Sequence, residues 1–272
     1  MKWGDVLKNR KIFILLIILL IVFGLAFFTY PYISNWLFEK QSIHKIDTYE
    51  KEVNNFPQEV REAEWEKAKK YNEMLLTGNN KSMQEKYYSI LNIGGVSMMG
   101  SIEIPDIKVK LPIYHGTGEY TLGKGVGHME GTSLPIGGKG THSFLTTHTG
   151  LPTAKLFTDL DKLMVSDVFH IRIMGEKLTY QVEEIRVVPA EETFSFAPSK
   201  NKDLVTLVTC TPYGINSHRL LVQGTRIHIS NDLPVSDYKG NPYDMLWFIF
   251  LVLLAVLIML FGIHLYKRVC SY

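Results

Sequence analysis

The sequence is poor in cysteine and has almost no excess of either charge. Cys210 and Cys270 are the only cysteines among 272 residues, too few for a disulfide-stapled scaffold or a four-thiolate zinc site. Lys and Arg total 29 and Asp and Glu 27, which gives a formal net charge of +2 at pH 7. This balance excludes the strongly basic surface of a nucleic-acid-binding protein. Since 46% of the residues are hydrophobic, a largely disordered chain is excluded as well.

The first of two long uncharged runs covers residues 12–28, IFILLIILLIVFGLAFF, and carries no polar side chain. Its length is sufficient to span a bilayer. The aromatic residues that follow at 30–36 are typical of a membrane interface, whereas a signal peptide has a shorter apolar core and then small residues at a cleavage site. We therefore expect residues 12–33 to form a membrane helix that is retained.

The second run covers residues 245–266, in which His264 is the one side chain able to carry charge, and Lys267 and Arg268 follow it. Four basic residues precede the first run. By the positive-inside rule, both chain ends lie in the cytoplasm and residues 32–244 lie outside the cell. Two buried core helices are the alternative, but such helices carry a polar face and neither run has one. The sequence thus predicts a two-span protein of the cell membrane, with the lipid bilayer as a partner.

The segment between the two runs changes character along its length. Residues 34–76 are charged, with a helical period that Pro57 interrupts, and predict a helical stalk in two parts. Residues 77–100 are rich in Gly, Asn, Ser and Met and predict a long loop with one short helix. Short segments of period two, bounded by turn residues, fill most of residues 101–232 and predict a small antiparallel sheet or barrel. A further short helix is expected within residues 151–163.

A cysteine and an arginine mark the meeting point of two predicted strands. Cys210 ends the strand at residues 204–209, and Arg219 opens the next strand after an eight-residue connection. Antiparallel strands joined in this way place the two residues side by side. A guanidinium beside a thiol favours the thiolate and can donate hydrogen bonds to an oxyanion. Because the membrane separates Cys210 from Cys270, Cys210 is the sole thiol of the outer domain, and its alternatives are a reactive nucleophile or an inert buried cysteine.

A cysteine nucleophile needs a partner that exchanges protons near neutral pH, and histidine is that residue. His148 follows the predicted strand at residues 142–147 and precedes a Gly-Leu-Pro turn, where a barrel displays its chemistry. Spacing alone leaves other histidines open as alternatives: His115, His128, His142 and His218. Metal binding by His142 and His148 is a further possibility from their shared strand face, but the sequence places no further ligand nearby. We therefore expect no metal and no cofactor.

The stretch TLVTC at residues 206–210, followed by TPYGINSHRL, resembles the active-site signature of sortases, the membrane-bound cysteine transpeptidases of Gram-positive bacteria. Residues 102–117 (IEIPDIKVKLPIYHGT) and 125–163 (GVGHMEGTSLPIGGKGTHSFLTTHTGLPTAKLFTDLDKL) extend the resemblance to class C sortases, which polymerise pilins. The resemblance covers roughly residues 100–229. Two membrane spans also fit class C.

The resemblance implies a mainly-β fold, with a closed sortase-type β-barrel, short helices, a helical N-terminal stalk and two transmembrane helices. It places the family's essential histidine on His148, its nucleophile on Cys210 and its arginine on Arg219. Cys210 is then expected to attack the carbonyl of a Thr in the C-terminal sorting signal of a pilin and to form a thioester. A Lys amine of another pilin subunit resolves the thioester as an isopeptide bond.

The same resemblance implies that His148 protonates the leaving amide and deprotonates the incoming amine, while Arg219 holds the substrate or the oxyanion. The alternatives are a sortase-like cysteine hydrolase, a housekeeping-type transpeptidase that anchors proteins to the cell wall, and a non-enzymatic scaffold for pilus assembly.

Two departures from the family pattern stand out. His148 lies between Thr147 and Thr149, whereas the family commonly has Gly before this histidine and Arg or Ser after it. The Asp-Pro-aromatic motif of the class C lid is also missing, since Asp47 is the one Asp between residues 42 and 100 and Thr48 follows it. Any lid is then held differently, and we predict that it is more mobile than a standard lid. Taken together, the expected organisation is a cytoplasmic tail (1–11), a transmembrane helix (12–33), a helical stalk (34–76), a lid-like loop (77–100), the catalytic barrel (101–232), a linker (233–244), a second transmembrane helix (245–266) and a cytoplasmic tail (267–272).

Overall fold

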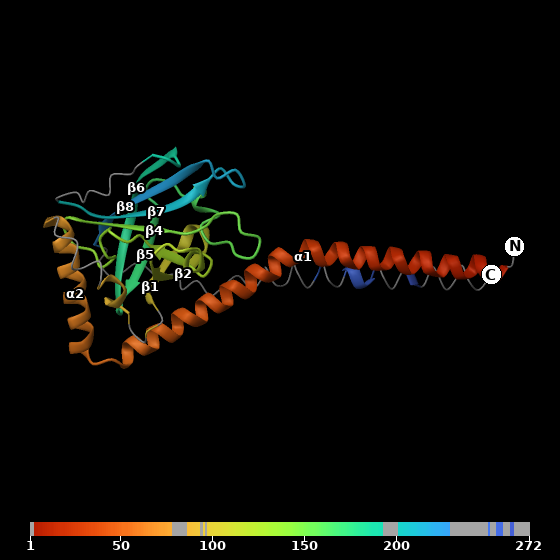
Figure 1. Ribbon diagram of the computed structural model, residues 1–272, viewed down its shortest axis with the longest axis horizontal. Coiled ribbons are helices and arrows are strands. Elements are labelled where there is room, and N and C mark those ends of the chain that lie inside the picture. The colour runs from red at the N-terminus through yellow and green to blue at the C-terminus, as the bar shows by residue number, and fades with distance from the viewer. Residues whose placement is uncertain are drawn as a thin grey trace. The chain divides into compact units, whose positions relative to one another are not determined.

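The computed structural model describes residues 3–77, 86–92, 95, 97–192, 201–228, 250, 254–257 and 262–263 (Figure 1). The chain divides into two compact units, one made of residues 1–34 and 239–272 and the other of residues 35–238. The long helix α1 (Trp3–Asn55) contributes residues to both units.

The amino-terminal part of α1 is apolar and exposed. From Leu15 onward it contains a window of mean hydropathy 2.3 with no buried residue, so it is long and apolar enough to cross a membrane. Within the described residues it is the one helix with this property. The second predicted span, residues 245–266, lies outside the described part of the chain except for Phe250, 254–257 and 262–263, which are helical. The predicted linker (233–244) and carboxyl-terminal tail (267–272) also lie outside it.

Pro57 divides the predicted stalk, as expected. Helix α1 ends at Asn55, and helix α2 (Gln58–Thr77) begins directly after Pro57, whose carbonyl accepts from the amides of Val60 and Arg61. Proline has no amide hydrogen and disfavours a helical residue before it, so it ends one helix and opens the next. The first stalk helix is not a separate element, because α1 continues unbroken from the apolar segment.

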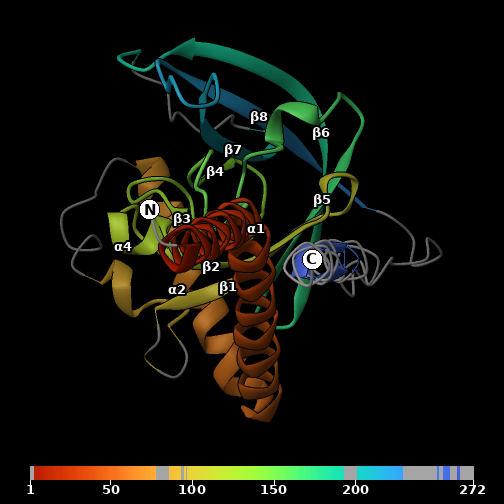
Figure 2. The same ribbon diagram turned by 90° about the vertical axis from the view of Figure 1, so that its right-hand side faces the viewer.

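Eight strands within the described residues close into a barrel in the order β1-β2-β3-β4-β7-β8-β6-β5. Figure 2 shows β4, β7 and β8 next to one another, as they are in Figure 1. The strands are β1 (Met98–Ile104), β2 (Val109–His115), β3 (Val126–His128), β4 (Thr141–Thr146), β5 (Val168–Ile173), β6 (Glu176–Pro189), β7 (Asp203–Thr211) and β8 (His218–Ile227). The predicted mainly-β barrel is confirmed. The purely antiparallel arrangement is not, since β2 pairs with β3 and β4 pairs with β7 in parallel.

Helices α1 and α2 bury aromatic side chains in the same core as the barrel. Tyr49 of α1 is 4% exposed, and its hydroxyl donates to the carbonyl oxygen of Met99 on β1 at 2.7 Å. Tyr71 of α2 is 1% exposed in the same cluster. This packing fixes the carboxyl-terminal half of α1 to the domain that contains the barrel, because buried aromatic side chains contribute most to such contacts.

The connections between strands contain short helical turns: η1 (Tyr87–Ser89), η3 (Pro105–Ile107), α4 (Glu119–Leu122) and η4 (Leu160–Lys162). The helix expected within residues 151–163 was wrong, since only the single turn η4 forms there. Leu156 has a φ of +44° in the middle of the segment, which a right-handed helix cannot contain. This segment is instead a loop of local turns that also bonds to Asn35 and Ile107.

Candidate active site

Cys210 and Arg219 are direct cross-strand partners on β7 and β8, which confirms the predicted neighbourhood. β4 lies on the other side of β7 and runs parallel to it, with Thr146 opposite Val208. The contact continues beyond the last residue of β4, because the Thr147 amide donates to the Val208 carbonyl at 3.3 Å and the Thr209 hydroxyl donates to the Thr147 carbonyl at 2.9 Å.

His148 is the next residue along the chain, so extending this register puts it level with Cys210. The extended register thus aligns His148 with the cross-strand pair Cys210 and Arg219 in one row at the adjacent ends of β4, β7 and β8. Residues level with one another on neighbouring strands point to the same face of a sheet. The three residues singled out from the sequence are thus brought together by the fold.

The row lies at the edge of a small apolar cluster on one face of the sheet. Side chains alternate along β7, so Val208 and Cys210 share a face that differs from that of Leu207. Leu207 belongs to the main core, whereas Val208 packs with Phe144, Val188 and Leu221 in a separate cluster. Cys210, one step beyond Val208, is partly exposed and has no disulfide partner. The thiol is therefore reachable beside an apolar surface.

His148 is held by its neighbours rather than by strong contacts of its ring. Its side chain is 24% exposed, and Nε2 lies 3.4 Å from Oε1 of Glu119, the first residue of α4, whose side chain is 91% exposed. Nε2 makes no hydrogen bond of good geometry, so the contact is an ion pair only when the ring is protonated. Exposed pairs of this kind contribute little stability. The His148 ring therefore contributes little to holding the fold together.

The backbone beside His148 is well fixed. The Thr147 hydroxyl lies 2.7 Å from the carbonyl oxygen of Gly125 and 3.1 Å from that of Leu122, which attaches the α4 turn to the end of β4. Gly150 has a φ of +75°, and a Cβ there would meet the ring of Tyr213 at 3.1 Å. The positive φ favours glycine at this turn.

Arg219 is anchored by the backbone and keeps its charge uncompensated. Its Nη1 donates to the carbonyl oxygens of Asn216 at 3.1 Å and His218 at 3.0 Å. Among the described residues, no carboxylate lies within ion-pair distance of it. A guanidinium has five N–H donors, so several remain available for a substrate. A positive charge opposite Cys210 suits a thiolate or an oxyanion.

The structure separates His148 from three of the other candidate histidines. His142 is buried, and its Nε2 engages the hydroxyl of Thr206 at 2.7 Å. In His115, Nδ1 lies 3.0 Å from the Ser97 carbonyl and Nε2 lies 2.7 Å from the Ile90 carbonyl, and burial lowers the pKa of this side chain. Burial also lowers the pKa of His128 to about 4. Groups of three His, Cys, Asp or Glu side chains able to hold a metal are absent from the part of the chain that the structure describes.

Tyr87 is a residue that the sequence reasoning missed. It is fully buried, and its hydroxyl donates to Nδ1 of His128 at 2.8 Å and accepts from the Gly116 amide at 3.0 Å. Together with His115 it attaches residues 86–92 of the predicted lid-like loop to β2 and β3. The predicted greater mobility stays a prediction, since residues 78–85 lie outside the described part of the chain.

A scan against protein families matches the sortase domain at residues 102–227. The crystal structure of sortase C1 from Streptococcus agalactiae is similar at 43% identity and a TM-score of 0.66, covering 69% of this chain and 100% of that one. Sortase C of Clostridium perfringens, solved with the C-terminal cell wall sorting motif, is similar at 45% identity and a TM-score of 0.64, covering 69% of this chain and 100% of that one. Among curated proteins, sortase A of S. agalactiae is 27% identical over 204 residues, 72% of this chain and 77% of that protein.

The chain belongs to the sortase family of cysteine transpeptidases, and its similarity to class C sortases is confirmed.

Proposed function

We propose that this protein is a membrane-anchored pilin-polymerising sortase in which Cys210, His148 and Arg219 carry out acyl transfer. What supports these roles is the row of the three residues across β4, β7 and β8, with a partly exposed thiol between an imidazole and an uncompensated guanidinium. A free cysteine thiol has a pKa of about 8.5 and is only slightly ionised at pH 7, so neighbours that favour the thiolate increase its reactivity.

In the first half-reaction, Sγ of Cys210 attacks the carbonyl carbon of a Thr in the sorting signal. The tetrahedral oxyanion is stabilised by N–H donors of Arg219. His148 gives a proton to the leaving amide nitrogen, the C–N bond breaks, and a thioester remains on Cys210.

In the second half-reaction, the neutral Lys amine of another pilin subunit attacks the thioester, and His148 takes a proton from its nitrogen. The C–S bond breaks, an isopeptide bond forms, and Cys210 leaves as a thiolate beside the protonated His148. A protein substrate with a sorting motif is supported by the similar sortase C of C. perfringens, which was solved with the C-terminal cell wall sorting motif.

The proposed location follows from α1 and from the sequence. Sortases are cell-surface enzymes, and the exposed apolar part of α1 suits an anchor. We place a second span at residues 245–266, both termini in the cytoplasm and the barrel outside the cell, on the positive-inside rule.

The experiment is intact-mass spectrometry of the full chain in detergent after mixing with a pilin that carries its sorting signal. The wild-type chain is expected to gain the mass of the acylated pilin fragment and to lose it when a Lys-bearing pilin domain is added. Cys210→Ala should show no adduct, and His148→Ala should show a strongly slowed one. Release to a free carboxylic acid in the presence of the amine would favour a hydrolase, and transfer to a cell-wall amine in preference to pilin would favour an anchoring enzyme. Absence of any adduct, with an accessible thiol, would favour a scaffold.

A further inference from the structure

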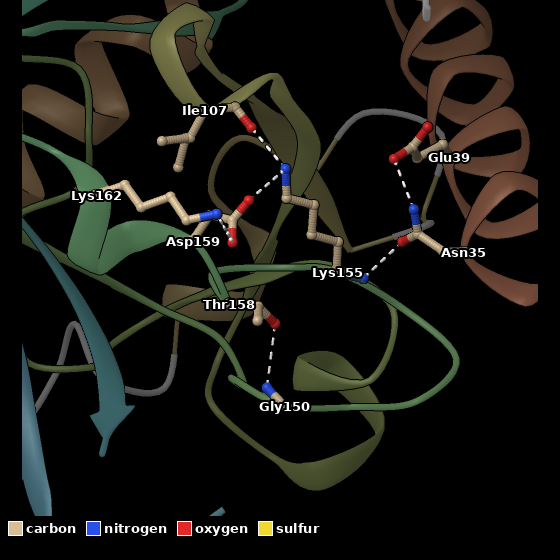
Figure 3. A network of polar contacts seen from close by, with 8 residues as sticks. All are labelled: Asn35, Glu39, Ile107, Gly150, Lys155, Thr158, Asp159 and Lys162. Atoms are coloured by element: carbon tan, nitrogen blue, oxygen red, sulfur yellow. Dashed lines mark hydrogen bonds and ion pairs between the residues drawn. The ribbon is translucent and has the colours of Figure 1, made fainter. Parts of the chain in front are cut away.

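A polar network joins α1 to the loop that follows His148 (Figure 3). Asn35, at the start of the unit that contains the barrel, uses both ends of its amide. Its Nδ2 donates to Oε1 of Glu39, one helical turn further along α1, at 2.9 Å. Its Oδ1 accepts from the backbone amide of Lys155 at 2.7 Å. The bond to Glu39 orients the amide so that Oδ1 faces the loop.

Lys155 extends this network to the barrel. Its Nζ donates to the Ile107 carbonyl at 2.9 Å and pairs with Oδ2 of Asp159 at 2.7 Å. The other oxygen of Asp159 pairs with Lys162 at 2.9 Å. Lys155 is therefore the residue at which α1, the β1–β2 connection and the η4 turn meet, as Figure 3 shows.

Two residues beyond Lys155 the loop returns to His148. The amide of Phe157, a fully buried residue, donates to the His148 carbonyl at 3.2 Å. The Gly150 amide donates to the Thr158 hydroxyl at 3.1 Å. The backbone of His148 is thus bonded to Phe157, and the stretch of residues 155–158 is held at its first residue by Asn35.

We propose that Asn35 is a positioning residue: from helix α1, it holds the loop after His148 so that the His148 ring keeps the position needed for proton transfer. This inference rests on the proposed function of His148. Without Oδ1, the partly buried Lys155 amide loses its acceptor, which favours rearrangement of the loop. A small displacement of a proton-transferring group is enough to slow a reaction markedly, although binding of the substrate changes little.

The test uses the full chain in detergent and four variants. Asn35→Ala removes both hydrogen bonds. Asn35→Asp keeps the acceptor for Lys155 but places a carboxylate opposite Glu39, and like charges one turn apart repel. In the double variant Asn35→Asp with Glu39→Gln, the carboxylate at 35 accepts from the Lys155 amide and from the new side-chain amide at 39. Both bonds are then restored, and the one between positions 35 and 39 has its donor and acceptor exchanged. Gln58→Ala is the matched control, because Gln58 makes the same one-turn bond to Glu62 on α2 at 2.7 Å.

Two experiments are made on each variant: the kinetics of acyl-enzyme formation, which give kcat and KM, and hydrogen exchange of the peptide that contains residues 150–158. We expect Asn35→Ala to lower kcat about tenfold with KM within twofold and to speed exchange at least fivefold, as order-of-magnitude effects of a lost positioning contact. The double variant should regain most of the wild-type kcat and protection. Gln58→Ala should match the wild type in both.

The inference is overturned if Asn35→Ala behaves like Gln58→Ala, or if the double variant is as impaired as Asn35→Asp alone. These results leave the proposed function intact, since the wild-type chain still forms the acyl-enzyme. A wild-type chain that forms no acyl-enzyme refutes the proposed function separately. In that case unchanged exchange in Asn35→Ala would also refute the contact's role in ordering the loop.

Discussion

Two groups of residues on neighbouring strands of this barrel contain histidine, and they differ in how completely their polar atoms are satisfied. Around Tyr87 and His128, the hydroxyl and both ring nitrogens have close partners of matching donor or acceptor character inside the protein. Around Cys210, His148 carries no well-formed ring hydrogen bond and Arg219 carries no ion pair among the described residues. A satisfied, buried group stabilises the fold, whereas an open and incompletely satisfied one is available for chemistry.

The largest expected effect comes from removing the proposed nucleophile, which should affect activity and leave stability nearly unchanged. Cys210→Ala should lower acyl-enzyme formation by a factor of about 10³ or more, because Cys210 is the one cysteine within residues 101–232. The partly exposed side chain contributes little packing, so the midpoint of thermal unfolding should stay within about 2 °C of the wild type. A stopped-flow mass assay and a melting curve measure the two effects. An unfolded variant, or one that still forms the adduct, would contradict the assignment.

Arg219→Lys tests the role of the guanidinium in the same group of residues around Cys210. Lysine keeps the charge opposite Cys210 but cannot donate to the two backbone carbonyls and to a substrate oxygen at once. We expect kcat/KM to fall by about 10²-fold, within the range for loss of an oxyanion donor. Arg226→Lys, on the same strand outside the row, is the control. Equal losses in the two variants would mean that the row has no special role.

The buried histidine of the other group, His128, should make the stability of the fold depend on pH. Burial holds the pKa of His128 at about 4, below the 6.5 of the unfolded chain, so the folded state disfavours the extra proton. The contribution of neutral His128 to the free energy of unfolding is fully present above about pH 6.5 and is lost as the pH falls toward 4. The whole loss amounts to about 3 kcal/mol. Urea unfolding between pH 7.5 and 4.5 measures this loss.

The pKa of His170 is also lowered to about 4, first by burial and then by Lys177 and Arg172. The measurement is therefore repeated in the His170→Gln background, where the pH dependence reports on His128 together with His115, whose pKa burial also lowers. A stability that does not depend on pH in that background would contradict the account of His128.

The smallest expected effect concerns the anchor of the lid-like loop. Tyr87→Phe removes one hydroxyl and leaves Nδ1 of His128 and the amide of Gly116 without it. The free energy of unfolding should fall by about 1–3 kcal/mol, the cost of leaving buried polar groups unpaired. Tyr88→Phe, whose partly exposed hydroxyl contacts Glu130 at 3.3 Å, should cost less than about 0.5 kcal/mol. Equal costs would show that the buried contacts of Tyr87 are not what holds residues 86–92.

Local sequence signals predicted the parts of this fold that depend on neighbours along the chain. Alternation at Ile102 and Ile104 predicts β1, and the short connection after Cys210 predicts its pairing with Arg219. The level position of His148 could not be derived in this way, because it depends on the parallel pairing of β4 with β7 across more than fifty residues. From spacing alone four other histidines remained, and resemblance to the family selected His148.

Long-range contacts also explain the failures. The helix expected within residues 151–163 has suitable composition, but the segment bonds instead to Asn35 on α1 and to Ile107, and it turns through a left-handed residue at Leu156. Tyr87 was not singled out because its partner His128 lies 41 residues away. Helix propensity is weak beside such tertiary contacts.

The most direct test of the central claim is to locate the acyl group by tandem mass spectrometry after the full chain has reacted with a sorting-signal pilin. The account predicts that the group is attached to the peptide containing Cys210, that it leaves on addition of a Lys-bearing pilin domain, and that the product contains an isopeptide bond. Attachment at Cys270 or at a lysine, or a Cys210 that is readily alkylated but never acylated by any sorting-signal pilin, would contradict it.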